Sequence, residues 1–154
     1  AREICAGRGQ PLPQLFLADT MGWANPDAVR RLVNEVRAAV PGSRIGLHLH
    51  DTRGLGAANV LAALDEGVDL FDSSVAGLGG CPFAAHGDRG AAGNICTEDM
   101  VFLCHEMGIE TGIDLEALVE CARLAERIIG RKLNGHVMHA GTLAGYRAPK
   151  AAAA

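Results

Sequence analysis

The sequence predicts an α/β protein built on parallel strands, and three features support that fold class. Nearly half of the 154 residues are hydrophobic (49%) and only 4% are aromatic, which suits a core of small aliphatic side chains. Short apolar segments typical of buried strands alternate with segments of helical periodicity. The pattern Asp-Thr-x-Gly occurs at residues 19–22 and 51–54, each time where a strand is expected to turn into a helix. Repetition at this interval suits a TIM barrel or a doubly wound sheet.

The predicted elements follow from local signals taken in chain order. Residues 15–20 form an apolar run typical of a buried strand. Asn25 followed by Pro26 predicts a helix start, and Pro41-Gly42 ends that helix. The later predicted elements are a strand at residues 44–50, a helix at 55–66, a strand at 68–75, a helix at 97–107 and a helix at 114–129.

Two histidines mark the carboxyl end of the second predicted strand. Side chains two residues apart in a strand point to the same face, so His48 and His50 face one way. Parallel α/β folds bind ligands at that end of their strands. The pair suits a metal ion, and a hydrogen-bonded pair of core histidines is the alternative interpretation.

Three aspartates, Asp19, Asp51 and Asp72, lie at or near the carboxyl ends of the predicted strands. Carboxylates at this position can orient metal ligands or accept a substrate proton, but Asp also caps helices and forms turns. Both interpretations stay open for Asp51 and Asp72. We expect Asp19 to be functional, because the histidine pair places it beside the site.

A glycine-dense loop at residues 76–94 is far longer than ordinary connections of about 4–6 residues, so it can fold closely over a ligand. Cys81 lies near its middle, where a thiol can act as acid, base or nucleophile. The other four cysteines are interpreted as small apolar residues. Asn94 closes the loop, either as a helix-start residue or as an oxygen ligand. Two imidazoles with oxygen ligands favour Mg²⁺ or Mn²⁺ over a closed zinc site.

Charge and composition argue against several classes of protein. The net charge of -4 argues against a nucleic-acid or anionic-membrane partner. No apolar run approaches the ~20 residues that span a bilayer. An odd number of cysteines without a Cys-x-x-Cys pair argues against a disulfide framework or a zinc cluster. We therefore expect a reduced, cytoplasmic setting with no nucleic-acid or membrane partner.

The remaining polar residues carry weaker signals. His86, His105, His136 and His139 have no partner pattern and are interpreted as surface or loop residues. Arg131-Lys132 follows the last predicted helix, and is either a solvated helix end or a phosphate contact.

Four segments resemble a known family. Residues 48–54 (HLHDTRG), 72–83 (DSSVAGLGGCPF) and 93–99 (GNICTED) resemble the signatures of 3-hydroxy-3-methylglutaryl-CoA (HMG-CoA) lyase, and residues 17–22 (LADTMG) match the strand that precedes them. The likeness runs from about residue 15 to 140. The GLGGCPF segment is specific, because isopropylmalate synthase and acyl-pyruvate-type aldolases share the His-x-His strand but lack this cysteine loop.

The resemblance implies a fold and an activity. The fold is the C-terminal part of a TIM barrel, about three β/α units followed by C-terminal helices, in an enzyme that is a dimer at full length. The activity is cleavage of HMG-CoA, or a similar 3-hydroxyacyl-CoA, to acetyl-CoA and acetoacetate with Mg²⁺ or Mn²⁺. The implied roles are metal ligation by His48, His50 and Asn94, catalysis by Cys81, Asp19, His48 and Glu98, and contact with CoA by Arg131 and Lys132.

Two departures from the family bear on activity. The stretch from Cys81 to Asn94 is longer than the family's loop, near residues 86–90, which can shift Cys81 or alter the acyl preference. The family's first strand, which carries an Arg-Asp pair, is absent. Without it the ion loses an anionic ligand and the barrel cannot close. We expect the chain alone to be inactive or very weakly active, and prone to associate.

The predicted organisation is a partial segment at residues 1–14, a lyase domain at 15–145 and a disordered tail at 146–154. Two other functions stay open. One is a sister enzyme that condenses or cleaves 2-oxo acids, and loss of activity in Cys81→Ala distinguishes the lyase from it. The other is a metal-binding remnant without catalysis that acts as an interaction partner, which would bind Mn²⁺ without turnover.

Overall fold

The computed structural model describes residues 7, 14–80 and 93–147. They form two compact units. The strand unit contains the described residues up to Ser74 together with those of Leu78–Ile95, and the helical unit contains Val75–Gly77 and the described residues from Cys96 onward.

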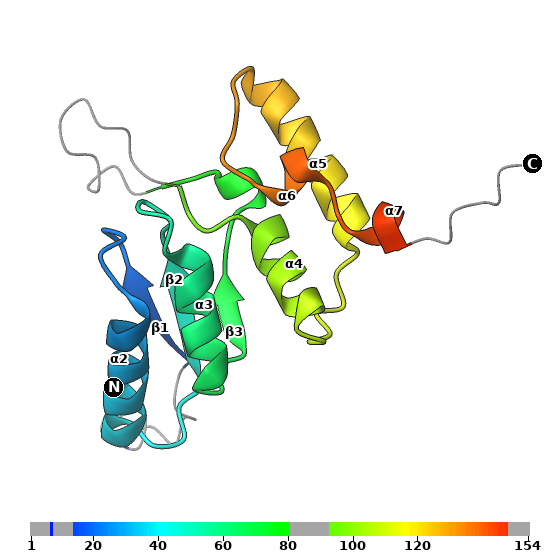
Figure 1. The fold of residues 1–154 in the computed structure, drawn as a ribbon. Coiled ribbons are helices and arrows are strands. Elements are labelled where there is room, and N and C mark those ends of the chain that lie inside the picture. The colour runs from blue at the N-terminus through cyan, green and yellow to red at the C-terminus, as the bar shows by residue number, and fades with distance from the viewer. Residues whose placement is uncertain (1–6, 8–13, 81–92, 148–154) are drawn as a thin grey trace, which may run out of the picture. The chain divides into compact units, whose positions relative to one another are not determined.

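The strand unit is built on a parallel three-stranded sheet (Figure 1). Its strands are β1 (Leu15–Asp19), β2 (Ile45–Leu49) and β3 (Leu70–Asp72), in the order β1-β2-β3. Two helices connect them, so the predicted alternation of strands and helices around a parallel sheet is confirmed.

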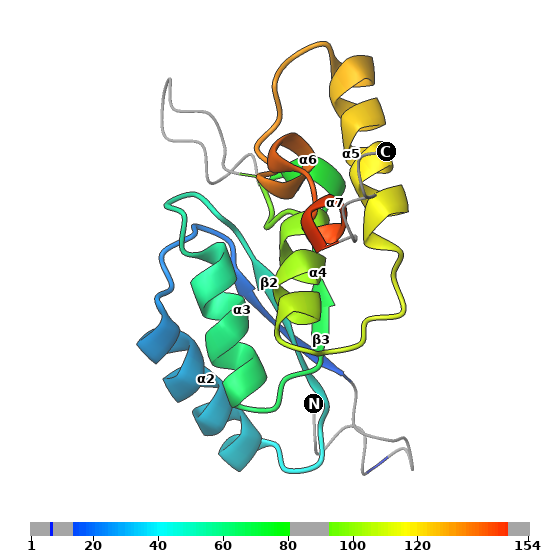
Figure 2. The ribbon, with the colours of Figure 1, turned by 45° about the vertical axis from the view of Figure 1, so that its right-hand side comes forward.

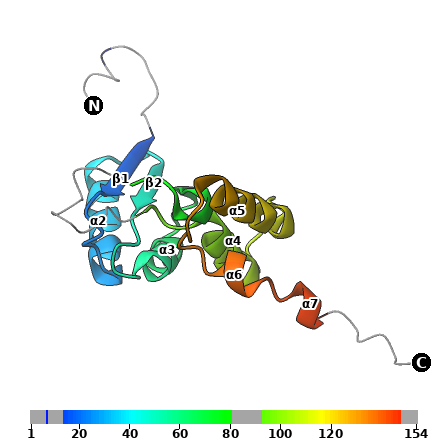
Figure 3. The same cartoon turned by 90° about the horizontal axis from the view of Figure 1, so that it is seen from above.

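The connecting helices α2 (Pro26–Ala39) and α3 (Gly56–Asp65) pack side by side and lie on the same side of the sheet (Figures 1 and 3). The start of α2 follows the predicted signal, because the Asn25 side chain accepts a hydrogen bond from the Ala28 N–H at 2.9 Å. Val29 and Val33 of α2 are buried and form an apolar pocket with leucines of β1 and β2. This pocket is part of the core of the strand unit.

The opposite face of the sheet carries His48 and Asp72, two of the residues singled out in the sequence. Phe16 is in register with Gly46, and their next neighbours on that face toward the carboxyl end are Ala18 and His48. A Cβ at Gly46 would lie 2.8 Å from Cε1 of Phe16, so only glycine leaves room for this ring. His48 therefore lies on the same face as the Phe16 ring, one residue pair closer to the carboxyl ends of the strands.

The repeated Asp-Thr-x-Gly pattern forms the same turn twice. The Gly22 N–H donates to the Asp19 carbonyl at 3.1 Å, and the Gly54 N–H donates to the Asp51 carbonyl at 3.2 Å. Both glycines adopt positive φ angles, +60° and +72°, that disfavour other residues. The repeat is thus a structural device that turns each strand toward its helix.

The described residues of the helical unit form two longer helices and three short ones, which are labelled in Figure 2 except for the short 3-10 helix. Its elements are η1 (Val75–Gly77), α4 (Thr97–Glu106), α5 (Leu115–Ile129), α6 (Val137–Ala140) and α7 (Ala144–Arg147). The Asp114 carboxylate accepts from the Ala117 N–H at 3.1 Å at the start of α5, and Gly130 ends this helix with a φ of +73°. The buried apolar residues of the unit include Val101, Cys104, Val119, Ala122, Leu133, Val137 and Met138.

The structure differs from the predicted elements in two details. β3 covers only Leu70–Asp72 because the chain turns into η1, where Ala76 takes a left-handed φ of +56°. The short elements η1, α6 and α7 were not expected. The last described residues form α7, where Arg147 forms an ion pair with Glu106 at 2.7 Å, and the tail at residues 146–154 stays a prediction.

Among the described residues, no helix combines the length and the apolar character needed to cross a bilayer.

Candidate functional site

The site is built at the carboxyl end of β2. His48 is the next-to-last residue of β2, and His50 follows two residues later on the same face. The segment before α4 runs beside this end, because the Asp51 N–H donates to the Gly93 carbonyl at 3.2 Å and the Ile95 N–H donates to the Leu49 carbonyl at 3.0 Å. His50 and Asn94 therefore form an isolated antiparallel bridge.

The two imidazoles converge on one point. Their Nε2 atoms lie 3.1 Å apart, and the ring planes are inclined by 66°. Two imidazole nitrogens that bind one divalent ion at roughly 2.1 Å at right angles lie about 3 Å apart. The separation thus fits two adjacent ligands of one ion, and also the hydrogen-bonded pair that was the alternative interpretation.

Asp72 orients one of these rings. Because β3 is in register with β2, Asp72 lies directly beside His48, and its carboxylate bonds to Nδ1 of that ring. A carboxylate on one imidazole nitrogen fixes the ring and directs the lone pair of the other nitrogen to a ligand. Of the two interpretations left open for Asp72, this contact supports the orienting one.

Asn94 presents an oxygen to the same region. Its amide nitrogen donates to Oγ of Ser74 at 2.6 Å, which fixes the direction of the amide group. Its Oδ1 is buried and has no hydrogen-bond partner among the described residues. An unpaired buried carbonyl oxygen is costly, and a hard cation would satisfy it.

His50 is nearly inaccessible, with 3% of its surface exposed. Burial, together with the nearby His48, lowers its pKa, while Asp19 and Asp72 act in the opposite direction. A lowered pKa keeps the imidazole neutral near neutral pH, and neutral imidazole is the form that binds metals.

The two imidazole nitrogens and the amide oxygen together form a set of donors that fits a divalent ion. No group of three or more His, Cys, Asp or Glu side chains suited to a metal ion exists within residues 14–80 and 93–147. A strongly bound ion would therefore need a further anionic ligand from elsewhere.

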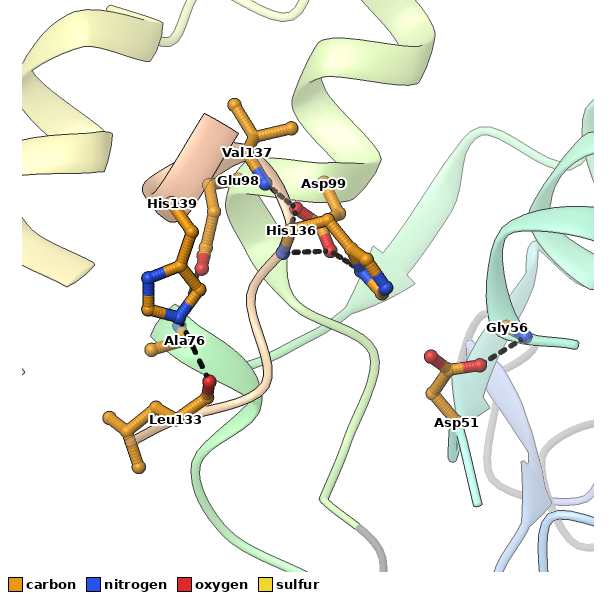
Figure 4. Close-up of polar contacts among 9 residues, drawn as sticks. All are labelled: Asp51, Gly56, Ala76, Glu98, Asp99, Leu133, His136, Val137 and His139. Carbon is orange, nitrogen blue, oxygen red and sulfur yellow. Dashed lines mark hydrogen bonds and ion pairs between the residues drawn. The ribbon is translucent and has the colours of Figure 1, made fainter. Parts of the chain in front are cut away.

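The carboxylates of Asp19 and Asp51 accept backbone hydrogen bonds at turns. The Asp19 carboxylate accepts the Trp23 N–H at 2.9 Å and the Ala24 N–H at 3.1 Å, and it lies close enough to His50 to influence the pKa of that ring. Asp51 accepts the Gly56 N–H at 2.7 Å at the start of α3 (Figure 4). The capping interpretation thus accounts for Asp51, whereas Asp19 both shapes a turn and adjoins the site.

Glu98 lies in the helical unit and is fully buried. Its Oε2 accepts the Ala76 N–H at 3.0 Å and so supports the left-handed turn of η1. Burial raises the pKa of this carboxyl, against the smaller effect of the Ala76 hydrogen bond. Cys81 lies outside the described residues.

The sequence interpretation missed a polar cluster in the helical unit. The Asp99 carboxylate accepts the backbone N–H groups of His136 and Val137 and bonds to Nδ1 of His136 at 2.8 Å (Figure 4). His139 bonds to the Leu133 carbonyl at 3.1 Å. Both histidines are exposed, in keeping with their interpretation as surface residues, but no signal in the sequence pointed to these contacts, which join segments far apart in the chain.

Arg131 and Lys132 are exposed just after Gly130 at the end of α5. They line a surface hollow together with Arg127 and His139. Their predicted contact with CoA stays a prediction.

Comparison with known proteins decides the family. The profile of the HMGL-like family matches residues 13–125, most of the chain. The chain belongs to the HMGL-like family. The family prediction is confirmed, and so is the prediction of an α/β chain that forms part of a TIM barrel.

The HMGL-like relatives include lyases from bacteria and animals. The chain is 44% identical over 122 residues to the 3-hydroxy-3-isohexenylglutaryl-CoA/hydroxymethylglutaryl-CoA lyase of Pseudomonas aeruginosa, covering 79% of this chain and 39% of that protein. It is 40% identical over 127 residues to the cytoplasmic HMG-CoA lyase of Danio rerio, covering 82% of this chain and 37% of that protein. The chain spans about two fifths of the length of these curated relatives.

A solved structure shows the same likeness. An HMG-CoA lyase from Acinetobacter baumannii, in complex with coenzyme A and 3-methylmalate, superposes with a TM-score of 0.80 at 44% identity. The match covers 92% of this chain and 45% of that one.

Proposed function

We propose that this chain carries part of the active site of a metal-dependent HMG-CoA lyase, which cleaves HMG-CoA to acetyl-CoA and acetoacetate. The observation that carries the proposal is the convergence of the His48 and His50 Nε2 atoms, 3.1 Å apart, beside the unpaired oxygen of Asn94. Membership of the HMGL-like family supports this reaction over other uses of a histidine pair.

His48, His50 and Asn94 would hold a divalent ion, Mg²⁺ or Mn²⁺. Such an ion supplies Lewis acidity toward the oxygen on C3 of the substrate. Asp72 acts on the ion only through His48, whose ring it orients.

The proposed reaction is a retro-Claisen cleavage. A base removes the proton of the C3 hydroxyl, the C2–C3 bond breaks to release acetoacetate, and the enolate of acetyl-CoA takes up a proton. When Nε2 of His48 holds the ion and Nδ1 holds Asp72, this ring has no free nitrogen for proton transfer. We therefore assign the first step to Asp19, whose oxygens keep lone pairs beyond their backbone contacts. Cys81 is the proposed acid for the last step.

Glu98 contributes in this proposal by shaping the site. Its contact with the Ala76 N–H holds the turn that leads into the glycine-rich loop of Cys81. Arg131 and Lys132 would contact the phosphates of the CoA thioester, which their charge favours. The acyl-CoA substrate, the cytoplasmic location and the full-length dimer belong to the same proposal.

Titration calorimetry of the chain with Mn²⁺ tests the metal site. We expect one site, and we expect His50→Ala and Asn94→Ala each to weaken binding at least tenfold, since ligand loss exceeds the 10–100-fold effect of outer partners. His105→Ala is the matched control, because His105 bonds to Thr111 in the helical unit. Equal affinities in all four proteins would refute the assignment.

A second experiment tests the reaction. The segments of the Pseudomonas aeruginosa relative outside the aligned region can be joined to this chain, and acetoacetate release from HMG-CoA measured in the resulting chimera. We expect turnover that Cys81→Ala abolishes. Turnover of a 2-oxo acid that survives Cys81→Ala would indicate the sister enzyme, and Mn²⁺ binding without turnover would indicate a remnant without catalysis.

A further inference from the structure

The segment that follows β1, residues 21–24, is tied to the next β/α unit by two side chains. Arg53, in the second Asp-Thr-x-Gly turn, donates through Nη1 to the carbonyl groups of Met21 and Gly22, at 3.3 and 3.1 Å. Asn59 of α3 donates from its side-chain amide to the Ala24 carbonyl at 3.1 Å. The backbone of this segment is therefore held by side chains that lie 31 to 35 positions later in the chain.

The two Asp-Thr-x-Gly turns also pack directly against each other. A Cβ at Gly22 would clash with the side chain of Thr52, so the backbone of the first turn lies against the second turn. Of the two side chains that hold residues 21–24, Asn59 is fully buried and Arg53 is exposed. The place of the first turn thus depends on the second β/α unit as well as on its own hydrogen bonds.

Residues 21–24 in turn hold the Asp19 carboxylate. Its Oδ1 accepts the Trp23 N–H at 2.9 Å, and its Oδ2 accepts the Ala24 N–H at 3.1 Å. Ala24 therefore contacts Asp19 through its N–H and Asn59 through its carbonyl. Because both carboxylate oxygens are bound to this segment, its position sets the direction of their remaining lone pairs.

We propose that Arg53 and Asn59 are positioning residues for Asp19 and act on the reaction through the backbone of residues 21–24. This inference rests on the proposed function, in which Asp19 removes the proton of the C3 hydroxyl. A base works only within hydrogen-bond reach of the proton that it removes, and a small misplacement slows the step strongly. The second β/α unit thus supplies the support for a base that belongs to the first.

The same two β/α units offer a matched control at their other end. Arg37, in the last turn of α2, is exposed and donates through Nη2 to the Glu66 carbonyl, which follows α3, at 2.6 Å. Like Arg53, it joins the two units through a backbone carbonyl, but the contact lies far from Asp19 along both helices. Arg37→Ala therefore removes a comparable contact and leaves residues 21–24 in place.

The fluorescence of Trp23 tests the support in the 154-residue chain, because this is the only tryptophan. Time-resolved anisotropy measures the amplitude of its fast motion. We expect a larger amplitude in Arg53→Ala and Asn59→Leu than in the wild type and Arg37→Ala, and recovery in Arg53→Lys, which keeps a donor. Circular dichroism checks folding, and Arg53→Ala decides the result by itself because its site is exposed. Equal amplitudes in the wild type and Arg53→Ala would overturn the proposal.

Kinetics of the chimera described above test the effect on the reaction. Arg53→Ala should lower kcat for acetoacetate release by up to about a hundredfold with little change in KM, as expected when a group that acts in the transition state is misplaced. Arg53→Lys should recover most of the loss, and Arg37→Ala should leave kcat unchanged. An equal loss in Arg37→Ala would indicate a general effect on stability and would overturn the positioning role.

The variant Asp19→Asn separates this inference from the proposed function. In the Asp19→Asn background, Arg53→Ala should lower kcat no further, because Arg53 acts through the carboxylate. Independent, additive losses would contradict the proposal. Unchanged turnover in Asp19→Asn would refute the proposed base and the inference with it. Loss of turnover in Asp19→Asn with a normal kcat in Arg53→Ala would refute the positioning role alone.

Discussion

The Glu98 carboxyl is fully buried, and one of its oxygens has no partner among the described residues. Burial raises its pKa in the folded chain. A carboxyl with a raised folded pKa binds more protons when folded than when unfolded. Its contribution to folding stability is therefore fully present below the ordinary glutamate pKa and is lost as pH rises through the folded pKa.

The variant Glu98→Gln removes this titration. Above the ordinary pKa of 4.5, the free energy of unfolding of the wild type should fall relative to that of the variant, and level off past the folded pKa. Urea unfolding over a pH series measures both values. Glu110→Gln, at an exposed position, is the control. If the free energies of unfolding of the wild type and of Glu98→Gln changed in parallel with pH, the raised pKa of Glu98 would be contradicted.

Gly135 gives a second prediction for single residues. A Cβ at this position would clash with Oε1 of Glu98 and lie 2.9 Å from Sδ of Met138. Gly135→Ala should therefore lower the free energy of unfolding by about 1–3 kcal/mol, the range for overpacked interiors. Gly7→Ala, where a Cβ meets nothing within 4 Å, should change it by a few tenths at most. Chemical denaturation measures both free energies of unfolding. If Gly135→Ala were as stable as the wild type, the prediction would be wrong.

At the candidate site, the sequence could predict the one arrangement that follows from local geometry. The shared direction of His48 and His50 follows from the two-residue period of a strand, which any strand imposes. The contact of Asp72 with His48 depends on strand register, and that of Asp99 with His136 depends on packing across the helical unit. Neither leaves a signal in neighbouring residues, so both appear only in three dimensions.

Helix ends are the clearest feature at the scale of elements. Asp114 accepts the Ala117 N–H at 3.1 Å and so satisfies one of the free N–H groups at the start of α5. Asp114→Ala should lower the free energy of unfolding by about 1 kcal/mol. Asp114→Ser, which can cap in the same way, should recover most of the loss. Thermal unfolding of the three proteins measures the difference, and equal midpoints would exclude a role for the cap.

The long helices could be predicted within a residue or two, whereas the short ones could not. The starts of α2 and α5 carry a capping side chain, and their apolar residues repeat with helical period. The turns α6 and α7 are four residues long, and their positions depend on Asp99 and on the Glu106–Arg147 pair. Their order comes from distant contacts rather than from local propensity.

At the scale of the whole molecule, we expect the proposed ligand set to limit the activity of the chain. The proposed ligands are two imidazoles and one amide oxygen, and no group of three or more His, Cys, Asp or Glu side chains suited to a metal ion exists among the described residues. We expect the purified 154-residue chain to release little or no acetoacetate from HMG-CoA in a coupled assay. Turnover by this chain alone, abolished in Cys81→Ala, would contradict the expectation.

The register of the sheet has a consequence for how the chain can be monitored. Side chains alternate between the two faces of a strand, so a slip of β3 by one residue would bring Phe71 or Ser73 beside His48 in place of Asp72. The carboxylate contact of the His48 ring therefore exists only in the correctly aligned sheet. A nuclear magnetic resonance signal from that ring would report the fraction of chains that have assembled properly, as a folding gauge that needs neither substrate nor ion.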